Sequence, residues 1–374
     1  MLTVEDTPRD VGIKTDYQRK RSYLLTKKES GLDVSEYFSA HFLNKGKSAY
    51  TNYCRACHGT NGDGNGPAAK GLRPQPRDFR LGTIKYGSVK AGSGYANQED
   101  FHRIVINGLN GSAMLPWDIS EERLDQIMAY IKTLSPEGKG WKNESAKIGD
   151  LVNITPDPFA GKDPNPQAIE MGKQLYHGLA DCASCHPAYA TKDYIYLVNK
   201  NSLMREKREY RKNMYLPELK YSQEYGFGIL PLDFTYHKIR AGNHQILDRK
   251  VLQEGDVKEL ISHQGLFRTI GAGIGGTAMP AWQGSIPDKF IWAIAYYIKH
   301  LATMSPEEVR GLQDELKKDE SRPLPDTISK GAQDSFAKSS LTVSTEIMEE
   351  LKKLYGADEE EGDDDDDDDD GDDD

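Results

Sequence analysis

The four cysteines of this 374-residue chain lie in two Cys-x-x-Cys pairs, and a histidine directly follows each pair. The two segments are Cys54-Arg55-Ala56-Cys57-His58 and Cys182-Ala183-Ser184-Cys185-His186. Two thiols one helical turn apart can each add to a vinyl group of a porphyrin, and the histidine that follows is then placed under the ring as the proximal iron ligand. We therefore predict two covalently bound haem c groups, with His58 and His186 as iron ligands.

Three other uses of paired cysteines explain less of this pattern. A four-cysteine zinc site would employ both pairs but would leave the two adjacent histidines without a role. A thioredoxin-like redox motif lacks a βαβ context here and would have to occur twice. Structural disulfides are disfavoured between cysteines that lie so close in sequence. Haem attachment accounts for all six residues at once.

The cysteine segments belong to a longer internal repeat. A run of paired landmarks occurs twice in the same order, which indicates two copies of one structural unit. The pairs are 46–50 with 172–176, Asp78-Phe79 with Asp233-Phe234, 84–87 with 239–242, 111–117 with 276–282, and 130–134 with 297–301. Each copy therefore has a glycine-bearing segment before its cysteines and a helical pattern at its end.

Both copies resemble class I cytochrome c domains, over about residues 35–140 and 165–305. The resemblance implies a mainly α fold of two tandem domains, each wrapped around one covalent haem. In that family an N-terminal helix carries a glycine where the last helix crosses it, and Gly46 and Gly172 fit this role because a missing Cβ lets two helices approach closely. The segments 120–134 and 287–301 are the expected crossing helices, the first capped by Ser120.

The resemblance also places a methionine in a loop before the last helix, commonly beside a proline, as the sixth iron ligand. Met279-Pro280 matches this pattern directly, whereas Leu115 separates Met114 from Pro116. We expect Met114 and Met279 to be the distal ligands, and a distal thioether favours Fe(II) and raises the potential relative to two histidines. The alternative is that both methionines only fill the core. The possible substitutes are Met204, Met214, His237, His244 and His263.

Other residues near the landmarks have expected roles around the haem. Arg77, Lys85 and Arg240 could neutralise haem propionates through charge-assisted hydrogen bonds, or could equally be solvated surface residues. Trp117 and Trp282 follow the methionine loops and fit either haem contact or core packing. The glycine-rich runs 59–67 and 271–276 follow a haem histidine and precede a ligand methionine, so we interpret them as haem loops and predict no nucleotide.

The charge of the chain is divided between its body and its end. The formal net charge is -11, but the last 17 residues hold 15 acidic side chains, so residues 1–357 carry about +4. Neither part has the concentrated basicity of a nucleic-acid-binding protein. We divide the chain into a polar N-terminal arm (1–34), a first cytochrome c domain (35–140), a linker (141–168), a second domain (169–305) with an insertion near 189–230, and a charged tail (306–374) whose poly-Asp end we expect to be disordered.

Two irons that each have two protein ligands leave no position for a substrate. We therefore predict a dihaem electron-transfer protein or subunit that passes single electrons between a donor and an acceptor protein. One of these partners could be a membrane respiratory complex. We favour a carrier over an enzyme. The alternative is a dihaem oxidoreductase, peroxidase-like or thiosulfate-oxidising, with one catalytic haem; a structural or sensor subunit is a third. No apolar run is long enough for a membrane span. The family resemblance implies a bacterial periplasm, and the absence of a signal peptide from the given chain indicates a mature or trimmed form.

Overall fold

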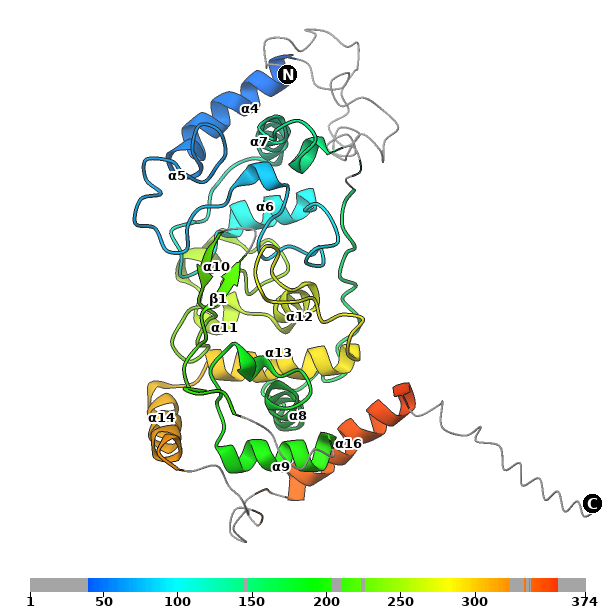
Figure 1. The fold of residues 1–374 in the computed structure, drawn as a ribbon. Helices are drawn as coiled ribbons and strands as arrows, with labels where there is room; N and C mark the ends of the chain where they lie inside the picture. Colours follow the sequence, from blue (N-terminus) through cyan, green and yellow to red (C-terminus); the bar gives the residue numbers. More distant parts are fainter. Residues whose placement is uncertain are drawn as a thin grey trace, which may run out of the picture.

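The protein, described by a computed structural model, is mainly α-helical, as predicted. The structure describes residues 40–143, 145, 147–203, 210–222, 226–322, 333, 336 and 338–355. The predicted N-terminal arm (1–34) and the poly-Asp end lie outside these residues. Figure 1 shows helices α4, α6 and α7 at one end of the molecule, α8, α12 and α13 beyond them, and α9, α14 and α16 at the opposite end.

The first unit, residues 40–143, is built on the crossing of α4 (Ala40–Tyr53) and α7 (Glu121–Thr133). Helix α7 begins after Ser120, whose side chain accepts a hydrogen bond from the Arg123 backbone N–H. A side chain on Gly46 would collide with the backbone of Gln126, so the crossing requires glycine at this position. Helix α6 (Gln98–Asn107) adds Phe101 and Val105 to the core that these two helices enclose.

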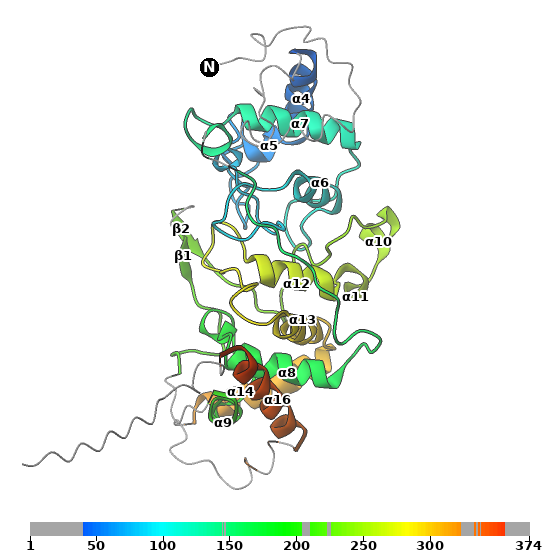
Figure 2. The same ribbon diagram turned by 90° about the vertical axis from the view of Figure 1, so that its right-hand side faces the viewer.

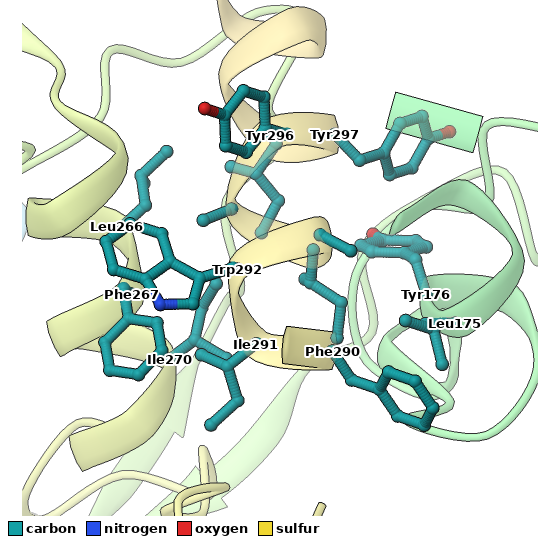
Figure 3. Close-up of a cluster of buried hydrophobic side chains, with 14 of the residues drawn as sticks. Leu175, Tyr176, Leu266, Phe267, Ile270, Phe290, Ile291, Trp292, Tyr296 and Tyr297 are labelled. Carbon is teal, nitrogen blue, oxygen red and sulfur yellow. The ribbon is translucent and has the colours of Figure 1, made fainter. Parts of the chain in front are cut away.

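The second unit, residues 165–305, repeats this arrangement with α8 (Pro166–His177) and α13 (Asp288–Ala302). Gly172 lies at the crossing, with the backbone of Ala293 against its Cα. Helix α12 (His263–Ala272) packs on the other side of α13 and corresponds to α6. In Figure 3 the side chains of α13 lie between those of α8 and those of α12, and α13 contributes more buried residues to this core than either of the other two helices.

Short elements connect these helices. In the first unit they are α5 (Arg55–His58), η1 (Phe79–Leu81) and η2 (Gly140–Lys142). In the second unit they are η3 (Cys182–Ser184), α9 (Lys192–Leu203), α10 (Arg249–Glu254) and α11 (Val257–Leu260). The antiparallel strands β1 (Lys220–Ser222) and β2 (Phe227–Ile229) form a hairpin, which Figure 2 shows at the edge of the molecule between the levels of α6 and α12.

Among the described residues, the segment after residue 305, which we expected to be a charged tail, contributes two helices. They are α14 (Pro306–Glu320) and α16 (Lys338–Tyr355). Helix α16 lies against α8 and α9 and buries Val343 and Ile347 in the core of the second unit. These residues are four positions apart and therefore share one face of the helix. Ser344, Thr345 and Glu346 separate them in the sequence, so the apolar pattern alone did not reveal this face.

The segment 141–168, predicted as a linker, is hydrogen-bonded to both units. The Val152 N–H donates to the Ser88 carbonyl of the first unit at 2.8 Å, and the Asn153 N–H donates to the Gln283 side chain of the second unit at 2.9 Å. The described residues of this segment therefore contact both units. Among the described residues, no helix is both long enough and apolar enough to cross a membrane.

Candidate functional site

The first Cys-x-x-Cys-His segment opens onto a cavity of about 360 Å³. The segment continues α4 through a hydrogen bond from the Cys54 N–H to the Tyr50 carbonyl (2.8 Å), and α5 follows with the His58 N–H bonded to the Cys54 carbonyl (2.8 Å). Cys57, His58 and Met114 all line the cavity. Its volume lies in the range of pockets that hold organic ligands. The fold therefore brings predicted anchoring and ligand residues to one enclosed space.

The ring of His58 is held by two contacts. Its Nδ1 lies 3.0 Å from the Arg77 carbonyl, and because a carbonyl can only accept, Nδ1 carries the proton and Nε2 has its lone pair free. The Phe79 ring stacks on the imidazole at 4.1 Å and 18°. Burial lowers the pKa of His58 to about 4, so the ring is neutral at physiological pH. A neutral imidazole oriented through its second nitrogen is the form that binds a metal ion.

Met114 is positioned by a compact loop after α6. The Leu109 N–H donates to the Met114 carbonyl at 2.8 Å, and the Ser112 hydroxyl donates to the Leu109 carbonyl at 2.7 Å. The Met114 N–H in turn donates to the Ser112 hydroxyl oxygen at 3.2 Å. Gly108, with φ 67°, makes the turn into this loop. Leu115 therefore does not prevent Met114 from lining the cavity, although it separates Met114 from Pro116.

The second histidine segment has the same set of contacts as the first. The Nδ1 of His186 lies 2.8 Å from the Leu232 carbonyl, and the Phe234 ring stacks on the imidazole at 4.7 Å and 21°. Burial lowers the pKa of His186, so this ring too is neutral at physiological pH. Leu232 and Phe234 occupy the places that Arg77 and Phe79 have in the first unit.

The Met279 loop also matches its counterpart. The Ile274 N–H donates to the Met279 carbonyl at 3.2 Å, and the Thr277 hydroxyl donates to the Ile274 carbonyl at 2.8 Å. The Met279 N–H donates to the Thr277 hydroxyl oxygen at 3.2 Å. Met279 packs against the core of the second unit. The two methionine loops thus share one hydrogen-bond pattern, with Thr277 in the place of Ser112.

The four cysteines are partly buried and unpaired. None of the four, Cys54, Cys57, Cys182 and Cys185, forms a disulfide. Burial raises the pKa of both Cys54 and Cys182 to about 12, which is opposite to the lowered pKa of thiols in disulfide exchange. Within the described part of the chain, no three histidine, cysteine or acidic side chains gather where they could hold one metal ion. The two cysteine pairs are therefore not gathered around one common position.

Two of the three predicted propionate partners, Arg77 and Arg240, lie in different surroundings. Arg77 lines the cavity of the first unit, and its Nε donates to the Thr83 carbonyl at 2.8 Å. Arg240, expected near the second haem, reaches the first unit, where its Nη1 donates to the Tyr86 hydroxyl at 3.4 Å. Tyr86 and Lys85 also line that cavity. Arg240 is therefore placed where the two units meet.

The suggested substitute ligands lie elsewhere or outside the described residues. Met214 is buried in a separate small cluster near Ile195. His263 stacks on Tyr296 at 3.7 Å, and His237 is exposed. Met204 lies outside the described residues.

Sequence reasoning missed two kinds of site residue. The first is the backbone acceptor of each histidine, because every residue has a carbonyl and the sequence carries no signal for its use. The second is Phe227 of the β1–β2 hairpin, which lines the cavity of the first unit although it belongs to the insertion of the second. Only the packing of the hairpin against the first unit reveals this contact.

Comparisons with known proteins agree with this geometry. Residues 42–131 match the sequence model of a family described as cytochrome C oxidase, cbb3-type, subunit III. A chain of the Kuenenia stuttgartiensis reducing HAO-like protein complex Kustc0457/Kustc0458 superposes with a TM-score of 0.50 at 25% sequence identity, over 69% of this chain and 96% of that chain. No curated protein matches the sequence. Residues 42–131 therefore form a cytochrome c domain, which implies covalently bound haem c.

Proposed function

We propose that this chain is a dihaem electron-transfer subunit that passes single electrons between redox protein partners. The repeated arrangement around His58 and His186 carries the proposal: each Nδ1 meets a backbone carbonyl, and a phenylalanine stacks on each ring. Each cysteine pair would attach one haem c, with Met114 and Met279 as the distal ligands. When bound, haem c supplies a one-electron iron couple whose potential depends on its axial ligands and surroundings.

The surrounding residues orient the ligands and exclude water. The carbonyls of Arg77 and Leu232 fix the tautomer of each histidine, which leaves Nε2 for iron. Phe79 and Phe234 cover one face of each imidazole and prevent it from rotating. With a histidine and a methionine on each iron, no coordination position is open to a substrate. This supports electron transfer over catalysis at iron.

The partners are proposed to be other redox proteins in the bacterial periplasm. A cytochrome c domain is typical of the outer side of an energy-transducing membrane. The structural neighbour belongs to a complex named for an HAO-like protein, which supports a role as one subunit of a larger redox assembly. The donor and the acceptor would each approach one of the two units.

The test replaces each proposed distal ligand in turn. Met114→Ala should abolish the thioether–ferric iron charge-transfer signal of one haem and lower its potential, and Met279→Ala should do the same to the other haem alone. Met128→Leu is the matched control because Met128 is fully buried in α7 and should leave both haem spectra unchanged.

Three results would contradict the proposal. A haem content of one per chain would refute the dihaem assignment. A Met114→Ala or Met279→Ala variant that keeps both native spectra would show that the replaced methionine is not a ligand. Ready binding of carbon monoxide or cyanide to one haem of the unaltered protein would favour the dihaem oxidoreductase.

A further inference from the structure

Two arginines and one aspartate are buried together where the two units meet. Arg103 on α6, Arg268 on α12 and Asp100 on α6 are 5%, 1% and 2% exposed, respectively. The Nη1 atoms of Arg103 and Arg268 both donate to the carbonyl of Asn243, at 3.5 and 2.9 Å. Burial of like charges around one acceptor is unfavourable in itself, so this arrangement requires an explanation.

The two arginines occupy equivalent places in the repeat. The Nη2 of Arg103 donates to the Tyr86 carbonyl at 2.7 Å, and the Nη2 of Arg268 donates to the Ala241 carbonyl at 2.8 Å. Tyr86 and Ala241 both have left-handed backbones, with φ of 62° and 49°, although neither is glycine. Each guanidinium thus stabilises a strained turn that lies directly after a predicted propionate partner, Lys85 or Arg240.

Among the described residues, Arg103 forms an ion pair with a carboxylate and Arg268 does not. Asp100 lies one turn before Arg103 and pairs with it at 2.9 Å, while the Ser88 N–H and hydroxyl donate to the same carboxylate at 2.6 and 2.8 Å. The equivalent residue before Arg268 is Gly265. A Cβ at Gly265 would lie 2.6 Å from the Gly242 carbonyl carbon, so close helix packing excludes an acidic side chain there.

The cluster of Arg103, Arg268 and Asp100 therefore has a net charge of about +1. Burial and the neighbouring Arg103 lower the pKa of Arg268 to about 9, so Arg268 remains charged at neutral pH. His244 lies beside both arginines, and burial together with their charges lowers its pKa, so it stays neutral. Arg240, at the Tyr86 hydroxyl, is the further cation at this interface.

The cluster adjoins both candidate haem sites. In the first unit, Tyr86 and Ile104, a neighbour of Arg103 on α6, line the cavity. In the second unit, Ile270 on α12 is the repeat equivalent of Val105, which lines that cavity, and it belongs to the core against which Met279 packs. A buried positive charge favours the reduced iron, because reduction removes one positive charge from the haem and the low dielectric of the interior strengthens the interaction.

Building on the proposed dihaem function, we propose that the buried charges of Arg103 and Arg268 raise the reduction potentials of both haems. The potential of the haem in the second unit is raised more. The asymmetry follows from Asp100, which forms an ion pair with Arg103 of the first unit and acts on Arg268 only as a neighbouring charge. Electrons would then pass from the first haem to the second. This arrangement requires contact between the two units, since Asn243 of the second unit accepts from Arg103 of the first.

The experiment measures both midpoint potentials by spectroscopic titration, with each haem assigned through the Met114→Ala and Met279→Ala variants. Arg268→Met should lower the midpoint potential of the second haem. At a fixed applied potential its ratio of Fe(II) to Fe(III) should fall by about threefold to tenfold, where tenfold corresponds to 59 mV. Asp100→Asn should act in the opposite direction and raise the potential of the first haem. Arg268→Lys, which keeps the charge, should restore most of the second potential.

Shifts of opposite sign in the midpoint potentials of Arg268→Met and Asp100→Asn distinguish an electrostatic role from a structural one. A loosened interface would shift the midpoint potentials of both variants in the same direction. Exposed Arg123 on α7 supplies the control, and Arg123→Met should move neither potential. Shifts of equal sign in Arg268→Met and Asp100→Asn, or no shift in either, would overturn the inference. If Arg268→Met does not fold, Asp100→Asn decides alone. Haem content and the methionine–iron signal are measured first, so a failure of the dihaem proposal is recognised separately.

Discussion

Replacement of Gly172 by alanine tests the helix crossing that positions the second histidine segment. The new Cβ would lie 2.6 Å from the carbonyl carbon of Ala293 and 2.8 Å from the Cβ of Tyr297, whereas ordinary contacts begin near 3.4 Å. The obstacle on α13 is backbone, which cannot rotate away as a side-chain end could. Helices α8 and α13 must therefore separate by close to 1 Å along much of the core shown in Figure 3.

The size of the effect follows from two opposing contributions. Overpacking of a close-packed core costs about 1–3 kcal/mol. Alanine in place of glycine within a helix returns about 1 kcal/mol through helix propensity. Because the obstacle on α13 is backbone, the overpacking cost should lie in the upper part of its range, at about 2–3 kcal/mol. We therefore expect a net loss of about 1–2 kcal/mol in the free energy of unfolding, which corresponds to a decrease of about 2–8 °C in Tm for a unit of this size.

The assay is thermal or urea unfolding followed by circular dichroism, with the haem spectrum recorded in parallel. Gly311→Ala is the matched control because Gly311 lies inside α14, is exposed, and has no atom within 4 Å of the position of a Cβ. That variant should gain about 0.5–1 kcal/mol in stability. A Gly172→Ala protein as stable as the unaltered one, or more stable, would refute the reasoning about the crossing.

Three further predictions concern a stacking ring, a buried histidine and the acidic end. Phe79→Ala should leave haem attachment intact but loosen His58 and lower the stability by about 3 kcal/mol, measured by urea unfolding; an unchanged midpoint would show that the stack is not needed. Burial and the charge of Lys299 lower the pKa of His263 in the folded protein to about 4, so between about pH 6.5 and 4 the unfolded chain binds a proton at His263 and the folded protein does not. The free energy of unfolding should therefore decline as the pH falls from about 6.5 to 4. His263→Gln should flatten that decline in unfolding curves measured across this pH range. Deletion of residues 358–374 should leave both haem spectra unchanged and slow electron transfer to a basic partner at low salt, and a rate independent of the deletion at every salt concentration would leave solubility as the role of this segment.

The sequence predicted the crossing helices of both units because the repeat supplies two independent copies of each pattern, whereas α6 and α12 were not predicted. Gly46 and Gly172 lie eight and ten residues before the first cysteine of their pairs, and both lie at helix crossings in the structure. Helix α16 was not foreseen, since only Val343 and Ile347 of its packed face are deeply buried apolar residues, separated by polar ones. An apolar face this sparse becomes recognisable only when the opposing helices are known.

The sequence by itself determined the chemistry of attachment. Two thiols and a histidine must lie within about one helical turn to serve one porphyrin, so the Cys-x-x-Cys-His segments are local and can be recognised without a fold. The contacts that bridge distant segments depended on tertiary structure. The Leu232 carbonyl beside His186, Phe227 in the cavity of the first unit, and the shared acceptor of Arg103 and Arg268 all join residues from different segments. Such contacts arise from the way the units pack, and no local spacing in the chain encodes them.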